Sequence, residues 1–198
     1  MSPAVFLDKD GTLIEDVPYN VDPARIRLAP HAAQALRELR AHGYRLVVVS
    51  NQSGVALNRF AASALDDVAH RLVELLAPHG AAPEAFYWCP HAPDDGCDCR
   101  KPAPGMLERA ARERGIDLGR SWMVGDILHD IEAGHRAGCR AVLIDNGNET
   151  EWDLSGLRRP DGRVADLAQA ARLIREADAR ELADPSACAA FATPGTRP

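Results

Sequence analysis

The chain has 198 residues, of which 46% are hydrophobic, 26% charged and 5% aromatic, a composition typical of a soluble globular protein with one self-sufficient core. Its formal net charge of -6 provides no overall positive field that would attract nucleic acid or an anionic membrane. No segment approaches the length of a membrane span, and Asp8 interrupts the first apolar run, so we expect a cytoplasmic protein.

Short apolar runs rich in β-branched residues predict buried strands. The clearest runs are 5–7, 46–49 and 142–144, and shorter candidates lie at 86–88 and 122–124. Their length and composition favour strands of a covered sheet over helices.

Amphipathic patterns between and after these runs predict five helices. They are expected near 32–39, 65–75 and 106–114, from just after Asp126, and at about 167–177. Strands that alternate with helices pair in parallel, so the fold class is α/β with a doubly wound, Rossmann-like sheet. We assign residues 1–177 to this domain and predict a loose C-terminal tail over 178–198, where periodicity is weak and two late prolines occur.

The stretch FLDKDGTL ends the first strand on two carboxylates, Asp8 and Asp10. Asp8 can attack phosphorus and form an aspartyl phosphate, and Asp10 can protonate the leaving oxygen and later deprotonate water. Gly11 lets backbone N–H groups close around a phosphate. A calcium loop is a poor alternative, because Leu13 stands where such a loop needs glycine and no glutamate follows at its twelfth position.

Three further polar residues follow later strands: Ser50, Lys101 and Asp126. Alone, each would be interpreted as a turn residue, a surface charge or a helix N-cap. Because carboxyl ends of parallel strands share one edge of the sheet, we expect them beside Asp8. Asp8, Asp126 and a backbone carbonyl would hold Mg²⁺, while Ser50 and Lys101 would stabilise the phosphoryl oxygens.

A second cluster lies in CPHAPDDGCDC. Its candidate ligands are Cys89, His91, Cys97 and Cys99. Three thiolates and one imidazole favour tetrahedral Zn²⁺ in a closed structural site. A disulfide is the alternative, which the one-residue gap between the last two cysteines and a reducing compartment disfavour. The zinc would clamp this loop and place Arg100 and Lys101 beside the phosphate.

Other polar and sulfur-containing residues have simpler interpretations. Asp130 either orients Lys101 or the metal shell, or lies on an exposed helix face. His129 and His135 are expected on a helix surface. Cys139 is expected to be a small buried hydrophobe, and Cys188 belongs to the predicted tail.

Four motifs in order, DKDGT, VVVSNQSG, RKP and GDILHD, resemble those of the haloacid dehalogenase (HAD) superfamily of phosphatases, over about residues 5–145. Within it, the sequence is most similar to the family of bacterial D-glycero-D-manno-heptose 1,7-bisphosphate phosphatases, and next to the histidinol-phosphate phosphatases. The zinc loop matches both families.

The resemblance implies a HAD-like fold, with Asp8 as nucleophile, Asp10 as acid and base, and Mg²⁺ at Asp8, the backbone carbonyl of Asp10, and Asp126. It makes Arg100 a substrate-recognition residue. It also implies two walls of the substrate pocket, formed by Asp16, Val17, Pro18 and Tyr19 on one side and by Ser50, Asn51, Gln52 and Ser53 on the other. Only about twenty residues separate Asp10 from the first helix, so we expect no cap domain.

The function implied is a Mg²⁺-dependent phosphomonoesterase that removes the 7-phosphate of D-glycero-D-manno-heptose 1,7-bisphosphate and acts as a monomer on a small phosphorylated sugar. Histidinol phosphate or another small metabolite is the alternative substrate, because Ile127 and the segment 56–58 depart from the heptose family's pattern. A non-enzymatic, zinc-stabilised binding module is the remaining alternative, but it does not explain an intact set of Asp8, Asp10, Lys101 and Asp126.

Overall fold

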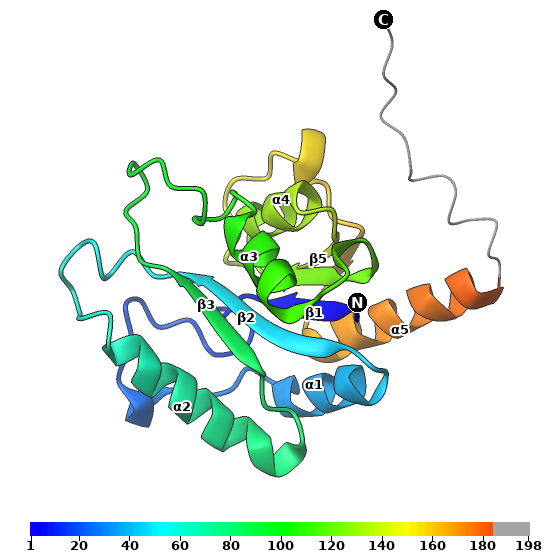
Figure 1. Ribbon diagram of the computed structural model, residues 1–198, viewed down its shortest axis with the longest axis horizontal. Helices are drawn as coiled ribbons and strands as arrows, with labels where there is room; N and C mark the ends of the chain where they lie inside the picture. Colours follow the sequence, from blue (N-terminus) through cyan, green and yellow to red (C-terminus); the bar gives the residue numbers. More distant parts are fainter. Residues whose placement is uncertain (184–198) are drawn as a thin grey trace, which may run out of the picture.

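The computed structural model describes residues 1–183, and its centre is a six-stranded sheet of order β3-β2-β1-β4-β5-β6 (Figure 1). The strands are β1 (Ala4–Leu7), β2 (Arg45–Asn51), β3 (Ala85–Cys89), β4 (Trp122–Gly125), β5 (Arg140–Ile144) and β6 (Gly162–Val164). Every neighbouring pair is parallel. The five predicted strands are confirmed, and β6 was missed because this short edge strand carries no apolar run.

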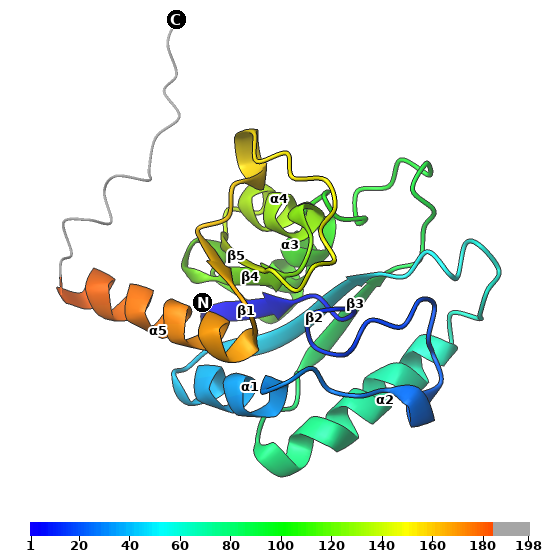
Figure 2. The ribbon, with the colours of Figure 1, turned by 180° about the vertical axis from the view of Figure 1, so that it is seen from behind.

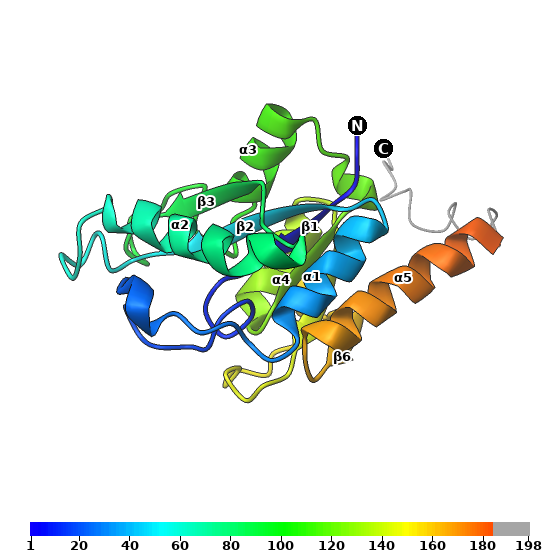
Figure 3. The same cartoon turned by 90° about the horizontal axis from the view of Figure 1, so that it is seen from below.

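Five α-helices cover the sheet. They are α1 (Ala32–Ala41), α2 (Ala64–Leu76), α3 (Gly105–Arg114), α4 (Leu128–Arg136) and α5 (Leu167–Ala183). Short 3-10 helices occur at η1 (Pro23–Arg25), η2 (Ala77–His79), η3 (Leu118–Arg120) and η4 (Gly156–Arg158). Helices α1, α2 and α5 lie on one face of the sheet, and α3 and α4 lie on the other (Figures 1 and 2). Figure 3 shows the face that α1, α2 and α5 cover.

Alternation of side chains along the strands produces two separate cores. Val5 and Leu7 of β1 pack with α1, α2 and α5, whereas Phe6, between them, packs with α3 and α4. All three side chains are fully buried. Burial on both faces explains why the strands are continuous apolar runs, and it confirms the doubly wound α/β prediction.

The strand order determines at which edge of the sheet the candidate site lies. From β1 the chain moves outward through β2 and β3, then returns to the other side of β1 as β4. The carboxyl ends of β1 and β4 are therefore adjacent at the point where the winding reverses, which is where open α/β sheets bind ligands. Between β1 and α1 the described chain forms only η1, so no cap domain is inserted there.

Helix α5 continues to Ala183, whereas the sequence pattern predicted its end at 177. Asp178 explains the difference, because its two carboxylate oxygens lie 2.8 and 2.7 Å from the Tyr44 hydroxyl oxygen and share its proton in one hydrogen bond. Residues 178–183 are therefore helical rather than part of a loose tail, and the rest of the predicted tail, including Cys188, lies outside the described residues. Within residues 1–183, no helix has both the length and the apolar character needed to cross a membrane.

His135 ties the segment between β5 and β6 to α4. Its Nδ1 lies 2.7 Å from the carbonyl oxygen of Leu157, and its Nε2 lies 2.9 Å from Oδ2 of Asp161. Both partners only accept hydrogen bonds, so both ring nitrogens are satisfied when the imidazole is protonated. The hydrogen bond to Asp161 accordingly raises the pKa of His135. The structure places His135 on α4, as expected, but these two contacts leave its side chain only 16% exposed.

This contact predicts a pH-dependent contribution to stability. A pKa raised in the folded state gives a stabilisation that is complete below the unfolded pKa of about 6.5 and is lost as pH rises through the folded pKa. His135→Gln should therefore reduce the free energy of unfolding more at about pH 5.5 than at about pH 8.5, as measured by urea denaturation. His70→Gln, at an exposed position of α2, is the control. An equal loss at both pH values for His135→Gln would contradict the prediction.

Candidate active site

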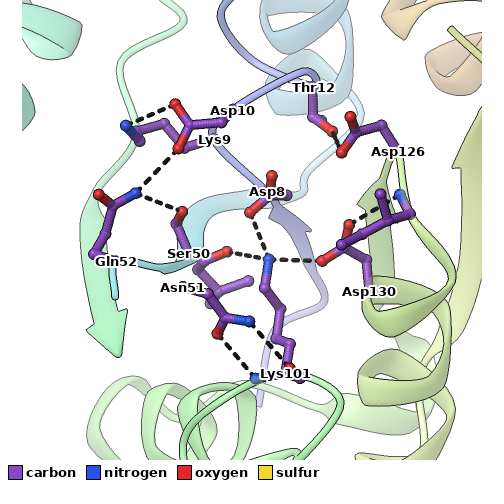
Figure 4. Close-up of polar contacts among 12 residues, drawn as sticks. Asp8, Lys9, Asp10, Thr12, Ser50, Asn51, Gln52, Lys101, Asp126 and Asp130 are labelled. Atoms are coloured by element: carbon purple, nitrogen blue, oxygen red, sulfur yellow. Dashed lines mark hydrogen bonds and ion pairs between the residues drawn. The ribbon is translucent and has the colours of Figure 1, made fainter. Parts of the chain in front are cut away.

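The ammonium group of Lys101 occupies the centre of the site (Figure 4). Its Nζ lies 2.5 Å from Oδ1 of Asp8, 2.6 Å from Oδ1 of Asp130 and 3.0 Å from the carbonyl oxygen of Val49. Burial alone would lower the pKa of Lys101, but the carboxylates of Asp130 and Asp8 more than offset this and raise it. Asp130 is fully buried, so the interpretation that it lies on an exposed helix face was wrong, and it pairs with Lys101.

Asn51 fixes the backbone of Lys101. Its Oδ1 accepts a 2.9 Å hydrogen bond from the Lys101 N–H, and its Nδ2 donates a 3.0 Å hydrogen bond to the Lys101 carbonyl. The amide at the end of β2 thus holds the loop that follows β3. Asn51 was predicted as a wall of the substrate pocket, and in the structure its polar atoms are directed at Lys101 (Figure 4).

Asp126, after β4, is held from two other segments. Its Oδ2 accepts hydrogen bonds of 2.7 Å from Asn148 and 3.4 Å from Asn146, and its Oδ1 accepts one of 3.4 Å from Thr12. Gly11 is required here, because it has φ +73° and a Cβ at this position would lie 2.0 Å from Asp126 Oδ2. Sequence reasoning missed these three donors. The available signal for two of them, Asn146 and Asn148, was the stretch NGN shortly after the fifth apolar run.

Three buried carboxylates form a candidate cation site. Oxygens of Asp8, Asp126 and Asp130 lie within 4.8 Å of one another. Burial, with repulsion from Asp8, raises the pKa of Asp126 to about 6. Both oxygens of Asp130 have partners, Oδ1 with Lys101 Nζ and Oδ2 with the Ile127 N–H. Asp8 uses only Oδ1 for Lys101, so Asp8 and Asp126 can offer hard oxygens of the kind that Mg²⁺ prefers. The donor set therefore fits the predicted ion.

Asp10 is anchored beside this cluster. Lys9 Nζ lies 2.8 Å from its Oδ1, and Gln52 Nε2 donates a 3.1 Å hydrogen bond to its Oδ2. Gln52 also donates a 3.0 Å hydrogen bond to the hydroxyl of the buried Ser50. One amide therefore connects the predicted acid and base with a predicted phosphoryl-binding residue (Figure 4).

Two small cavities open at this edge of the sheet. One, of about 250 Å³, is lined by Asp8, Asp10, Ser50, Lys101, Asp126 and their neighbours. The other, of about 270 Å³, shares part of that lining and adds Pro18, Tyr19, Gln52, Ser53 and Gly54. The shared residues are Asp10, Asp16 and Asn51, so the two cavities are adjacent.

Two predicted substrate residues lie outside this lining. Val17 is half-buried, and its carbonyl accepts a 3.1 Å hydrogen bond from the Asn20 N–H. Arg100 Nη1 donates to the carbonyl of His91 at 3.4 Å. A cavity of about 590 Å³ lies elsewhere, at the α5 contact with Tyr44 and Arg140, far from the strand ends that carry the predicted chemistry.

The zinc ligands predicted from sequence are brought together. Cys99 Sγ lies 3.3 Å from Cys89 Sγ, 3.6 Å from Cys97 Sγ and 3.2 Å from His91 Nδ1. Zn–S bonds of about 2.3 Å place tetrahedral thiolates about 3.8 Å apart, close to these separations. All three cysteines are free, so the disulfide alternative is not supported. Two further predictions are confirmed. Cys139 is buried, and His129 is exposed.

The ion pair of Lys101 with Asp130 predicts a large stability effect. Asp130→Asn removes one charge from a buried pair, which typically costs about 3–5 kcal/mol, and it loosens Lys101. We expect a lower urea midpoint and slower turnover.

Glu113→Gln is the control, because it breaks an exposed pair with Arg109 and should cost far less. A loss from Asp130→Asn no greater than that from Glu113→Gln would show that the buried pair does not support the site.

Comparison with known proteins gives a consistent result. The HAD-hydrolase-like family model matches residues 98–170. The D-glycero-beta-D-manno-heptose-1,7-bisphosphate 7-phosphatase of Pseudomonas aeruginosa is 37% identical over 72% of this chain and 81% of its own length. The Escherichia coli K12 protein of the same name is 36% identical over 85% and 93%.

Solved structures agree with these sequence matches. The D,D-heptose 1,7-bisphosphate phosphatase of Bordetella bronchiseptica, in complex with magnesium and phosphate, has a TM-score of 0.79 at 34% identity and covers 88% of this chain and 99% of its own. A putative HAD-like phosphatase from Mesorhizobium loti has a TM-score of 0.72, also at 34% identity, with coverages of 88% and 87%.

Proposed function

Because the chain belongs to the HAD-like hydrolases and is a phosphatase, we propose that it hydrolyses the 7-phosphate of D-glycero-D-manno-heptose 1,7-bisphosphate through an aspartyl-phosphate intermediate. The observation that carries this proposal is the position of Asp8. It ends β1 beside a buried lysine, with a second carboxylate two residues later and a polar cavity in front of it.

The chemistry follows from the residues present. A carboxylate oxygen of Asp8 attacks phosphorus, the P–O bond to the sugar breaks, and Asp10 gives its proton to the leaving alkoxide. Asp10 then takes a proton from water, which attacks phosphorus, releases inorganic phosphate and restores Asp8. Lys101 holds one oxygen of Asp8 and offsets negative charge on the phosphoryl group.

Two metals belong to this proposal. Mg²⁺, held by Asp8, Asp126 and the backbone carbonyl of Asp10, would reduce the repulsion between an anionic nucleophile and an anionic phosphate. Zn²⁺ at the cluster of three cysteines and His91 would fix the loop that ends in Lys101, since four protein ligands leave no open position for catalysis.

The sugar assignment rests on the relatives and on the second cavity. Asp16, Tyr19 and Ser53 line it and offer hydroxyl and carboxylate groups suited to a polyol. A site that hydrogen-bonds hydroxyl groups rejects analogues that lack them more strongly than an apolar pocket does. Histidinol phosphate is the competing substrate, because its family shares the zinc-ligand spacing.

A substrate panel tests the function. Phosphate release with Mg²⁺ should give a kcat/KM for the heptose bisphosphate about 10²-fold or more above that for histidinol phosphate, and phosphorus NMR should show that the 1-phosphate remains. Asp8→Asn should abolish turnover of every compound, since an amide cannot form the acyl phosphate.

The substrate assignment and the catalytic mechanism are tested separately. Equal kcat/KM values for the two substrates would remove the heptose assignment and leave the phosphatase. Wild-type rates with Asp8→Asn would contradict the mechanism itself.

The zinc assignment predicts about one Zn²⁺ per purified chain. Cys97→Ser should lower the zinc content, measured by plasma emission spectroscopy, and slow turnover by loosening the loop that carries Lys101. Cys139→Ala, at a buried cysteine outside the cluster, should keep its zinc. Full activity in a zinc-free preparation would rule out this structural role.

A further inference from the structure

Lys9 is a buried lysine between the two aspartates of the first motif. Its side chain is 1% exposed, and its Nζ lies 2.8 Å from Oδ1 of Asp10. Among the described residues, this carboxylate is the only ion-pair or hydrogen-bond partner of that ammonium group. Lys9 has no role in the proposed mechanism.

Stability does not explain a charge in this position. An ammonium group taken out of water costs free energy that a single partner seldom returns, and apolar replacements of buried pairs are often neutral or stabilising. The partner is itself 30% exposed, so water already solvates one end of the pair. The pair is better explained by what it does to the partner.

The orientation of the Asp10 carboxylate needs to be fixed. The torsion that turns a carboxylate about its Cβ–Cγ bond is broad and roughly two-fold, so an unrestrained Asp10 would sample many orientations. Lys9 fixes Oδ1 from the same loop, and Gln52 fixes Oδ2 from the end of β2. With both oxygens anchored, the carboxylate keeps one orientation at the border of the two cavities (Figure 4).

We propose that Lys9 is a positioning residue that orients the Asp10 carboxylate for proton transfer to the leaving alkoxide. This inference rests on the proposed function, in which Asp10 is the acid and base. Lys9 lines neither of the two cavities, so it would act on the reaction through Asp10.

Leaving-group dependence separates this role from a general structural one. A sugar alkoxide must be protonated as its P–O bond breaks, whereas p-nitrophenolate leaves without a proton. Since kcat/KM reports the steps up to formation of the aspartyl phosphate, loss of the oriented acid should lower it for a sugar phosphate and have much less effect for p-nitrophenyl phosphate. Misfolding would affect both esters together.

The experiment compares wild type, Lys9→Met, Asp10→Asn and the double variant, as full chains with Mg²⁺, on the best-cleaved sugar phosphate of the panel and on p-nitrophenyl phosphate. Lys9→Met should lower kcat/KM for the sugar phosphate by about 10²-fold, and far less for the aryl ester. Lys9→Arg, which keeps a cation, should recover part of the loss. In the double variant, Lys9→Met should add no further loss to that of Asp10→Asn, because both changes remove the same function.

The outcomes test the role of Lys9 separately from the proposed role of Asp10 as acid and base. If Asp10→Asn leaves the sugar phosphate at the wild-type rate, the acid assignment falls, and the role of Lys9 with it. If Asp10→Asn shows the leaving-group difference but Lys9→Met affects both esters equally or neither, only the role of Lys9 is overturned. Circular dichroism checks folding, and Lys9→Gln replaces Lys9→Met in the same comparison if the latter does not fold.

Discussion

The site depends on one buried positive charge. The Lys101 ammonium group is 2% exposed and stands between Asp8 and Asp130, and burial is tolerable only because two carboxylates and a carbonyl surround it. Its neighbours come from the end of β1, from β2 and from α4, while Lys101 itself follows β3. A single interaction therefore requires four segments to meet at one edge of the sheet, and this requirement fixes the geometry of the nucleophile.

Much of this arrangement could be predicted because parallel sheets obey a simple rule. Apolar runs marked five strands, and the polar residue after each of the first four had to lie at the same edge. Asp8, Ser50, Lys101 and Asp126 were placed in that way, without any knowledge of their distances. The cluster of three cysteines and His91 could be predicted for a different reason, since its members are close in sequence and chemically distinctive.

The remaining features depend on tertiary contacts that periodicity does not encode. Gln52 was predicted only as a wall of the substrate pocket, and the sequence did not reveal that its amide donates to Asp10 and Ser50. Asn148 follows Asp126 by many residues and reaches it only because β5 lies beside β4. The end of α5 was missed similarly, because Asp178 is stabilised by the distant Tyr44. Local propensity cannot reveal such partners.

Charge balance supports the proposed Mg²⁺. Its carboxylates are Asp8, Asp10, Asp126 and Asp130, and its ammonium groups are Lys9 and Lys101. Both lysines are paired with carboxylates, so little of their charge is left to attract an arriving phosphate from a distance. A chain of net charge -6 offers no long-range attraction instead. The proposed Mg²⁺ would supply positive charge for a phosphorylated substrate at this site, in addition to the stabilisation that Lys101 would give the phosphoryl group.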